Sequence, residues 1–259
     1  MAFPPERIVC LTEETVETLY LLGQQRRIAG VSGYAVRPPE VRKEKPRVSA
    51  FISADIPKIL ALKPDLVLTF SDMQADIVAS LIREGVEVHA FNQRTVAGIF
   101  AMIETLGAMV GAADKAAGLV AGYRGRIAAL RATAPAARQR IYFEEWDEPL
   151  ISGIGWVSEL VGIAGGEDCF PELAGCAGAR DRIVQPQDVI AARPDIIIGS
   201  WCGKKFRPEK VAARDGWSEI PAIRNGRIHE IKSTVILQPG PAALTDGLDR
   251  LAAIIRAGS

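Results

Sequence analysis

One short pattern occurs twice in the sequence and constrains the fold more than any other feature. Residues 61–68 read ALKPDLVL and residues 191–198 read AARPDIII. In each copy a proline ends a helical segment, because the residue before a proline is disfavoured in the helical region. The following run is apolar on both faces, as a parallel strand covered by helices on both sides requires. The repeat therefore predicts two similar α/β halves.

Short strands and helices alternate around both copies. Further strands are expected at residues 8–11, 28–32, 86–91, 140–143 and 227–231, and helices at 12–23, 76–84, 95–110, 155–164 and 247–256. Between the halves, residues 114–133 carry apolar side chains at helical spacing. A helix of that length spans about 30 Å, which favours a strut between two lobes.

We therefore expect an α/β fold with two Rossmann-like lobes, mostly parallel sheets and one long linker helix. The expected domains are an N-terminal lobe at 1–112, the linker at 113–135 and a C-terminal lobe at 136–259. Ligands of open α/β sheets bind beyond the carboxyl ends of the strands. The expected site is a cleft between the two lobes, lined by strand-end loops.

Composition and motifs exclude several classes of function. Lys plus Arg and Asp plus Glu both number 31, which argues against a nucleic-acid partner, and no apolar run reaches the roughly 20 residues of a membrane-spanning helix. Residues 153–158 approach a dinucleotide-binding motif, but a serine replaces its third glycine. His89 and His229 lie in expected strands, away from the cysteines. We expect a protein that is not an enzyme, with no cofactor and no metal site of its own.

The start of the sequence gives an expectation about the compartment. Residues 1–7 lead directly into the first expected strand, without a basic segment, an apolar segment or a cleavage site. Cys10 lies in that strand, which suits a reducing environment. We expect a cytoplasmic protein, or a periplasmic one if a signal peptide has been removed.

Several short motifs, in this order, resemble the substrate-binding proteins of ABC importers for cobalamin, iron-siderophores and haem. They lie at residues 7–9, 17–23, 30–34, 59–67, 165–166, 193–195 and 217–227. The resemblance implies two lobes joined by a single helix, and within the family it is strongest to cobalamin receptors. It places Tyr34 and Phe51 where those receptors have aromatic residues, a tyrosine against the corrin ring and a tryptophan.

The resemblance also implies partners. The expected ligand is a small-molecule metal chelate, an ABC permease is a further expected partner, and we expect a monomer. Receptors of this kind dock on the permease through glutamates, which would fall near Pro57 and Gln187. Neither is acidic, and Asp55 and Asp188 stand close by in a different phase.

Polar and aromatic residues at expected strand ends form the candidate site. The candidate ligand-binding residues are Glu13, Glu14, Tyr34, Phe51, Phe70, Asp72, Glu145, Trp146, Asp147, Trp156, Trp201, Cys202 and Lys204. Aromatic faces suit a flat macrocycle because they bury a large apolar area and lose few rotamers. For each tryptophan the alternative is packing in the core, and for the acidic run 144–148 and the basic residues 204–207 it is an ordinary solvated loop.

The leading hypothesis is non-enzymatic binding of a corrinoid, cobalamin or a precursor, for an ABC-type uptake system. The second hypothesis is a receptor for a ferric siderophore or haem, favoured by Lys204, Lys205 and Arg207. A hypothesis of another class is a cytosolic corrinoid chaperone or metallocluster enzyme accessory that works without a permease, since a fold alone does not fix a function.

Overall fold

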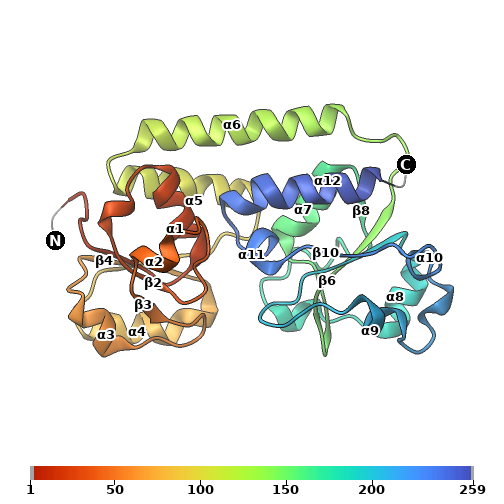
Figure 1. Cartoon of the computed structure of the whole chain (residues 1–259), viewed down its shortest axis with the longest axis horizontal. Coiled ribbons are helices and arrows are strands. Elements are labelled where there is room, and N and C mark those ends of the chain that lie inside the picture. Colours follow the sequence, from red (N-terminus) through yellow and green to blue (C-terminus); the bar gives the residue numbers. More distant parts are fainter. Residues whose placement is uncertain (1–2, 258–259) are drawn as a thin grey trace. The chain divides into compact units, whose positions relative to one another are not determined.

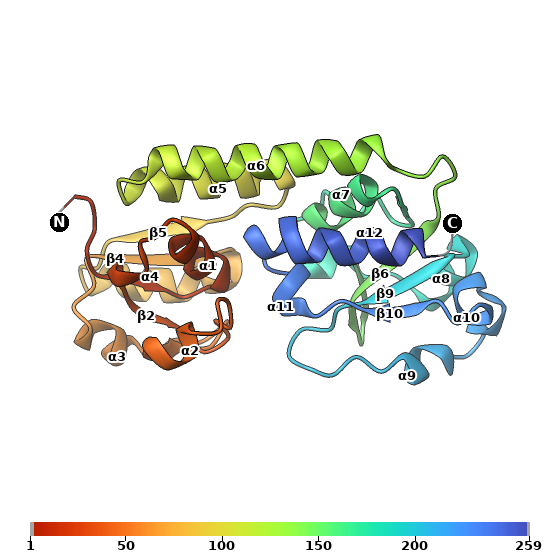
Figure 2. The same ribbon diagram turned by 45° about the horizontal axis from the view of Figure 1, so that its top comes forward.

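The computed structural model describes residues 3–257 and divides into two compact units (Figure 1). The first unit contains Met1–Gln93 and Ala97–Gly122, and the second contains Arg94–Val96 and Tyr123–Ser259. Helix α6 (Ala113–Ala132) contributes residues to both units and is uninterrupted (Figure 2). The expected long helix is thus present, and the boundaries 1–112, 113–135 and 136–259 remain our proposal for the domains.

The first unit holds a five-stranded, all-parallel sheet in the order β3-β2-β1-β4-β5. Its strands are β1 (Ile8–Cys10), β2 (Ile28–Ser32), β3 (Arg47–Ser49), β4 (Leu66–Phe70) and β5 (Val88–Phe91), and its helices include α1 (Glu13–Leu21), α2 (Val41–Glu44), α3 (Ile56–Ala61), α4 (Ala75–Arg83) and α5 (Val96–Met109). Every residue of β1 and β4 is buried. These two central strands account for the unbroken apolar runs in the sequence.

The second unit holds a five-stranded sheet in which β10, β9, β6 and β7 are neighbours and β8 pairs with β6. Its strands are β6 (Arg140–Asp147), β7 (Leu150–Ser152), β8 (Glu167–Asp168), β9 (Ile196–Gly199) and β10 (Ile228–Glu230), and its helices include α7 (Gly155–Ala164), α8 (Pro186–Ala192), α9 (Pro208–Ala212), α10 (Pro221–Arg224), α11 (Ser233–Ile236) and α12 (Leu248–Arg256). Only the β6–β7 pair is antiparallel among the described strands. The prediction of two mostly parallel α/β sheets is confirmed.

The repeated pattern makes the same contacts in both units. Lys63 and Arg193, which precede the prolines, leave the right-handed helical region with φ of 47°. The Asp65 carboxylate then accepts a hydrogen bond of 2.9 Å from the backbone amide of Arg7, before β1. The Asp195 carboxylate accepts one of 2.8 Å from the amide of Arg140, at the start of β6. Each aspartate therefore fastens the amino end of a central strand.

One expectation about the second unit was wrong. Residues 144–147 were expected in a loop after a strand at 140–143, but β6 continues through Asp147. There β6 pairs with β7, with an irregularity between Glu144 and Trp146. The segment lacks the apolar alternation of a strand, and its extended form comes from pairing with β7. The short strands β3, β7 and β8 were also missed.

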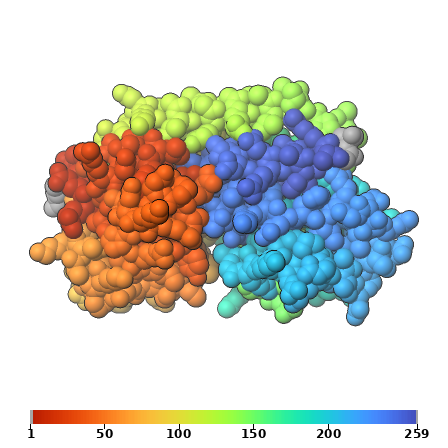
Figure 3. All heavy atoms as spheres, in the orientation of Figure 1, coloured from red at the N-terminus to blue at the C-terminus, as the bar shows by residue number. Residues whose placement is uncertain are grey.

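Helix α12 shows how the second unit covers its sheet. Its residues Leu248, Leu251 and Ile255 are buried at helical spacing. Its charged residues lie on the surface, and the helix forms part of the face of this unit seen in Figure 3. Asp249 there forms an ion pair with Arg126 of α6. No helix within residues 3–257 is long and apolar enough to cross a membrane.

Candidate functional site

In the first unit, one buried glutamine connects three segments at the carboxyl ends of the strands. The Gln74 side-chain amide donates to the carbonyl of Phe51 at 2.7 Å and to that of Leu11 at 3.3 Å. Its Oε1 accepts from the backbone amide of Phe70 at 3.1 Å. Gln74 has no solvent exposure, so all three bonds are made in the interior. It fixes the loops that follow β1, β3 and β4 relative to one another.

Ser71, directly after β4, has an unusual backbone conformation. Its φ of 66° and ψ of 169° lie in a region that is almost restricted to glycine. Its hydroxyl accepts a hydrogen bond from the amide of Met73 at 3.3 Å, and its own amide donates to the carbonyl of Phe91 at 2.9 Å. Strain of this kind is kept only where the surroundings determine it, and it often accompanies a binding loop.

Glu13 and Glu14 begin α1 and are both buried. The Thr12 hydroxyl donates to Glu14 Oε1 at 2.6 Å, and the Ser32 hydroxyl donates to Glu13 Oε1 at 3.3 Å. Burial, followed by the charge of Glu13, raises the pKa of Glu14 to about 8. Glu14 is therefore mostly protonated at neutral pH, and the pair carries less negative charge than the sequence indicates.

The other candidate residues of the first unit differ in exposure. The Tyr34 side chain, after β2, is 51% exposed, and its backbone amide donates to the Ser32 hydroxyl at 3.2 Å. Phe51 is half-buried, Asp72 is exposed and Phe70 is buried. Asp72 also borders a surface hollow of about 420 Å³ between α4 and β5. Tyr34 is the candidate whose ring is most available to a ligand.

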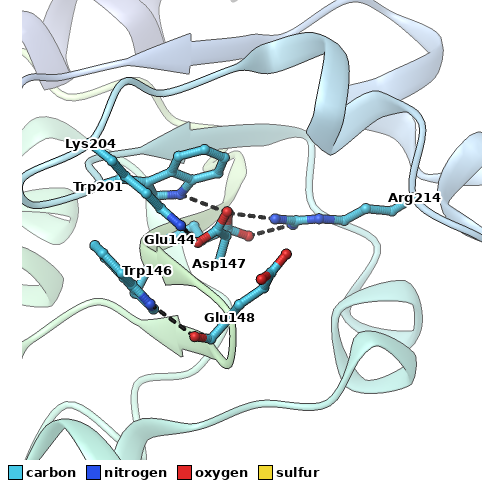
Figure 4. Close-up of polar contacts among 7 residues, drawn as sticks. All are labelled: Glu144, Trp146, Asp147, Glu148, Trp201, Lys204 and Arg214. Carbon is cyan, nitrogen blue, oxygen red and sulfur yellow. Dashed lines mark hydrogen bonds and ion pairs between the residues drawn. The ribbon is translucent and has the colours of Figure 1, made fainter.

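In the second unit, three acidic residues of β6 each have a basic partner from a distant segment (Figure 4 shows two of the three pairs). The Arg214 guanidinium donates to the two Glu144 carboxylate oxygens at 2.6 and 2.8 Å. Glu145 and Arg182 are joined by bonds of 2.7 and 3.1 Å, and Asp147 pairs with Lys204. Three of the four acids of the run 144–148 therefore have a neutralising partner.

The indoles of Trp146 and Trp201 lie on either side of the Lys204 ammonium group (Figure 4). The ammonium nitrogen is 4.2 Å from the ring centroid of Trp146 and 5.0 Å from that of Trp201. Trp201 Nε1 donates to Glu144 at 3.0 Å, and Trp146 Nε1 donates to the carbonyl of Glu148 at 2.9 Å. Both rings are thus oriented through their edges, with a face turned to the cation.

Packing behind Trp201 fixes its position. Phe206 packs edge-on against it, with ring centroids 4.9 Å apart. A Cβ on Gly199 would lie 1.8 Å from the Phe206 ring, so only glycine leaves room for this ring. Gly199 ends β9, and the sheet thereby sets the place of Phe206 and Trp201.

The remaining candidates of the second unit are Trp156 and Cys202. Trp156 is buried at the start of α7, and its Nε1 donates to the carbonyl of Ile236 at 2.9 Å. That placement favours the alternative in which it packs in the core. Cys202 is exposed in the loop after β9 and is not part of a disulfide.

Metal-binding groups are sparse in the described part of the chain. Within residues 3–257, no three His, Cys, Asp or Glu side chains are grouped closely enough to hold a metal ion. Burial raises the pKa of Cys10 and of Cys169 to about 12, so both remain thiols at neutral pH. Thiolates are the form that binds metals.

The sequence model of the periplasmic binding protein family matches residues 8–235 of this chain. The chain belongs to the periplasmic binding protein family. A vitamin B12-binding protein from Vibrio parahaemolyticus is 27% identical over 93% of this chain and 86% of the relative. An uncharacterised ABC transporter substrate-binding lipoprotein from Bacillus subtilis is 25% identical over 96% of this chain and 79% of the relative.

Solved structures from the same group share the fold. The periplasmic vitamin B12-binding protein of Vibrio cholerae superposes with a TM-score of 0.78 at 22% identity, over 99% of this chain and 98% of that one. The periplasmic haem-binding protein of a Roseiflexus species gives 0.81 at 23% identity, over 96% and 99%. Members of this family are binding proteins, and the resemblance seen in the sequence is confirmed.

Asp55 and Asp188, the acids near the expected docking positions, lie at the starts of corresponding helices in the two units but at different positions of the first turn. Asp55 precedes α3 and accepts a hydrogen bond of 3.0 Å from the amide of Lys58. Asp188 lies in the first turn of α8 and accepts one of 2.9 Å from the amide of Gln185. Both are exposed helix-capping residues in the elements that lead to the repeated strands.

Proposed function

We propose that the chain is the substrate-binding component of an ABC-type uptake system and that it binds a corrinoid, cobalamin or a precursor, without altering it chemically. The half-exposed ring of Tyr34 at the carboxyl end of β2 is the observation that carries this proposal. Tyrosine offers a large face to a flat macrocycle and loses few rotamers on binding. The similarity to vitamin B12-binding proteins over most of the chain supports the same ligand class.

The charge pairing in the second unit favours a corrinoid over an anionic ferric chelate. Of the three basic residues that suggested an anion site, Lys204 pairs with Asp147 and Arg207 pairs with Glu209. Both cations are thereby offset by an acid. Cobalamin presents amide side chains rather than carboxylates, and such groups need hydrogen-bond partners more than net charge.

Calorimetric titration with cyanocobalamin tests the proposal, with cobinamide, haemin and a ferric siderophore as parallel ligands. We expect binding heat with a corrinoid, and a Tyr34→Ala variant that binds it at least about tenfold more weakly. Phe3→Ala is the matched control, because Phe3 is 77% exposed and lies before β1. Binding heat with only haemin or the siderophore would instead support the second hypothesis, a receptor for a ferric siderophore or haem. No heat with any of the four would refute a tetrapyrrole or iron-chelate receptor.

We further propose that the protein works outside the cytoplasmic membrane, the compartment in the family description. The cytoplasmic expectation drawn from residues 1–7 finds no support in the comparisons. Fractionation of the native host is the test. Protein in the periplasmic or membrane-anchored fraction supports the uptake role, and protein in the cytosol would support the corrinoid chaperone instead.

A further inference from the structure

We infer that Trp146, Trp201 and Asp147 form a binding site for the ammonium group of an organic ligand, and that Lys204 is its internal occupant. We call these three residues the ammonium cage. The inference goes beyond the proposed corrinoid function and does not depend on it. Lys204 itself shows that the cage accommodates a cation, because its ammonium nitrogen lies 4.2 and 5.0 Å from the two indole centroids.

The walls of the ammonium cage are preorganised for a cation. The face of an indole attracts a cation within about 6 Å of its centroid, and cages of such rings recognise quaternary ammonium ligands. Both indole N–H groups are occupied at the ring edges, on the carbonyl of Glu148 and on Glu144. Trp201 is also held from behind by Phe206. The two rings are therefore held by contacts that do not involve Lys204.

Asp147 supplies the negative charge of the cage. Its side chain is 10% exposed, so its charge is only partly screened by water. The other two β6 acids are neutralised by arginines, Glu144 by Arg214 and Glu145 by Arg182. Asp147 is the one of the three whose partner is a lysine on an exposed loop. A ligand cation at this place would meet the Asp147 carboxylate once Lys204 withdraws.

Lys204 is built to be displaced. Its side chain is 36% exposed, and its neighbours Cys202, Gly203 and Lys205 are exposed as well. The lysine stem is flexible, and its ammonium group can be hydrated in many rotamers. A ligand ammonium can therefore take over the contacts that the Lys204 ammonium makes, with the rings left in place. The ligand class that fits is a small molecule with a primary or quaternary ammonium group.

Choline is a suitable probe, and its uncharged carbon isostere dimethylbutanol is the matched control. The indole N–H signals of the four tryptophans report binding by NMR, with assignment from single Trp→Phe variants. We expect choline to shift the Trp146 and Trp201 signals, and dimethylbutanol to have little effect. Sodium chloride at equal concentration corrects for ionic strength.

Variants locate the effect at the cage. We expect Lys204→Ala to bind choline about tenfold more tightly than the wild type, because the internal competitor is gone. Lys205→Ala, in the same exposed loop, should behave as the wild type. Adding Asp147→Asn to Lys204→Ala should weaken binding again. If added choline left the Trp146 signal of Lys204→Ala unchanged, or if dimethylbutanol shifted it equally, the inference would be overturned.

The same experiments separate the two proposals. Binding heat with cobalamin but no response to choline would refute the ammonium cage alone. A response to choline but no heat with cobalamin would refute the corrinoid function alone.

Discussion

Arg214 holds both carboxylate oxygens of Glu144, at 2.6 and 2.8 Å, where the Glu144 side chain has no solvent exposure. The same carboxylate accepts from Trp201 Nε1 at 3.0 Å. A buried acid of this kind needs its partner, because an uncompensated charge in the interior is costly. The pair therefore supports the position of Trp201 as well as the stability of the second unit.

Arg214→Ala should lower the free energy of unfolding by about 3–5 kcal/mol, because Glu144 would remain buried without a counter-charge. Urea unfolding followed by circular dichroism measures the change. Arg207→Ala is the control, since Arg207 and Glu209 are 53% and 64% exposed and such exposed pairs contribute little to stability. Equal losses of unfolding free energy in the two variants would show that the buried Glu144–Arg214 pair stabilises the protein no more than an exposed pair does.

Two substitutions at position 71 should separate backbone strain from hydrogen bonding. Ser71→Ala and Ser71→Gly both lose the hydroxyl that accepts from Met73, but only glycine relaxes a φ of 66°. We expect the glycine variant to be more stable than the alanine variant by about 1–3 kcal/mol. Thermal unfolding of the two variants side by side gives the difference. A smaller or reversed difference would mean that the loop adopts another backbone conformation.

Stability should depend on pH through Glu14. A glutamate titrates near about 4.3 in an unfolded chain, whereas burial raises the pKa of Glu14 in the folded chain to about 8. The folded state thus holds the proton more tightly. The resulting stabilisation is complete below the unfolded pKa and is lost as the pH rises through the folded one.

Glu14→Gln keeps a neutral side chain at every pH and removes this dependence. From pH 5 to pH 9, we expect the wild type to lose a few kcal/mol of stability relative to the variant. Denaturant unfolding at several pH values measures both proteins. Parallel pH profiles would show that Glu14 is already ionised at neutral pH, against the geometry of its burial.

Substituting alanine for a glycine should change stability in opposite directions in the two long helices α5 and α6. Gly122 lies inside α6, where a Cβ would meet no neighbouring element within 4 Å, so Gly122→Ala should stabilise by up to about 1 kcal/mol. Gly107 lies in α5, where a Cβ would approach the Cβ of Ala116 to 2.3 Å, so Gly107→Ala should destabilise. Thermal melting of both variants tests this pair. A gain at both positions would mean that α5 and α6 can separate without cost.

Much of the fold could be predicted from the sequence because local signals determine it. The Pro-Asp pairs that precede β4 and β9 locate two buried strands, and the glycines at 155 and 165 mark the ends of α7. The course of β6 beyond residue 143 could not be predicted, because β7 pairing rather than an apolar pattern extends it. Short strands such as β3 also depend on their neighbours more than on their own residues.

The candidate site was predictable as a set of residue types but not as a set of contacts. Arg214 and Arg182 bind Glu144 and Glu145 from 70 and 37 residues away, and no local pattern indicates such pairs. Gln74 reaches Leu11 across 63 residues for the same reason. The ligand-binding roles of Tyr34, Trp146 and the other candidates remain predictions for the titrations above.

The matching hydrogen bonds of Asp65 and Asp195 lie at the amino ends of the central strands. The candidate loops follow the carboxyl ends of the strands, on the opposite side of each sheet. Stability anchored at the amino ends does not depend on the composition of those loops. The exposed residues after β2, β4 or β9 could therefore be varied to retarget this scaffold to new cargo, as long as both aspartates and the buried contacts of Gln74 and Glu144 are retained.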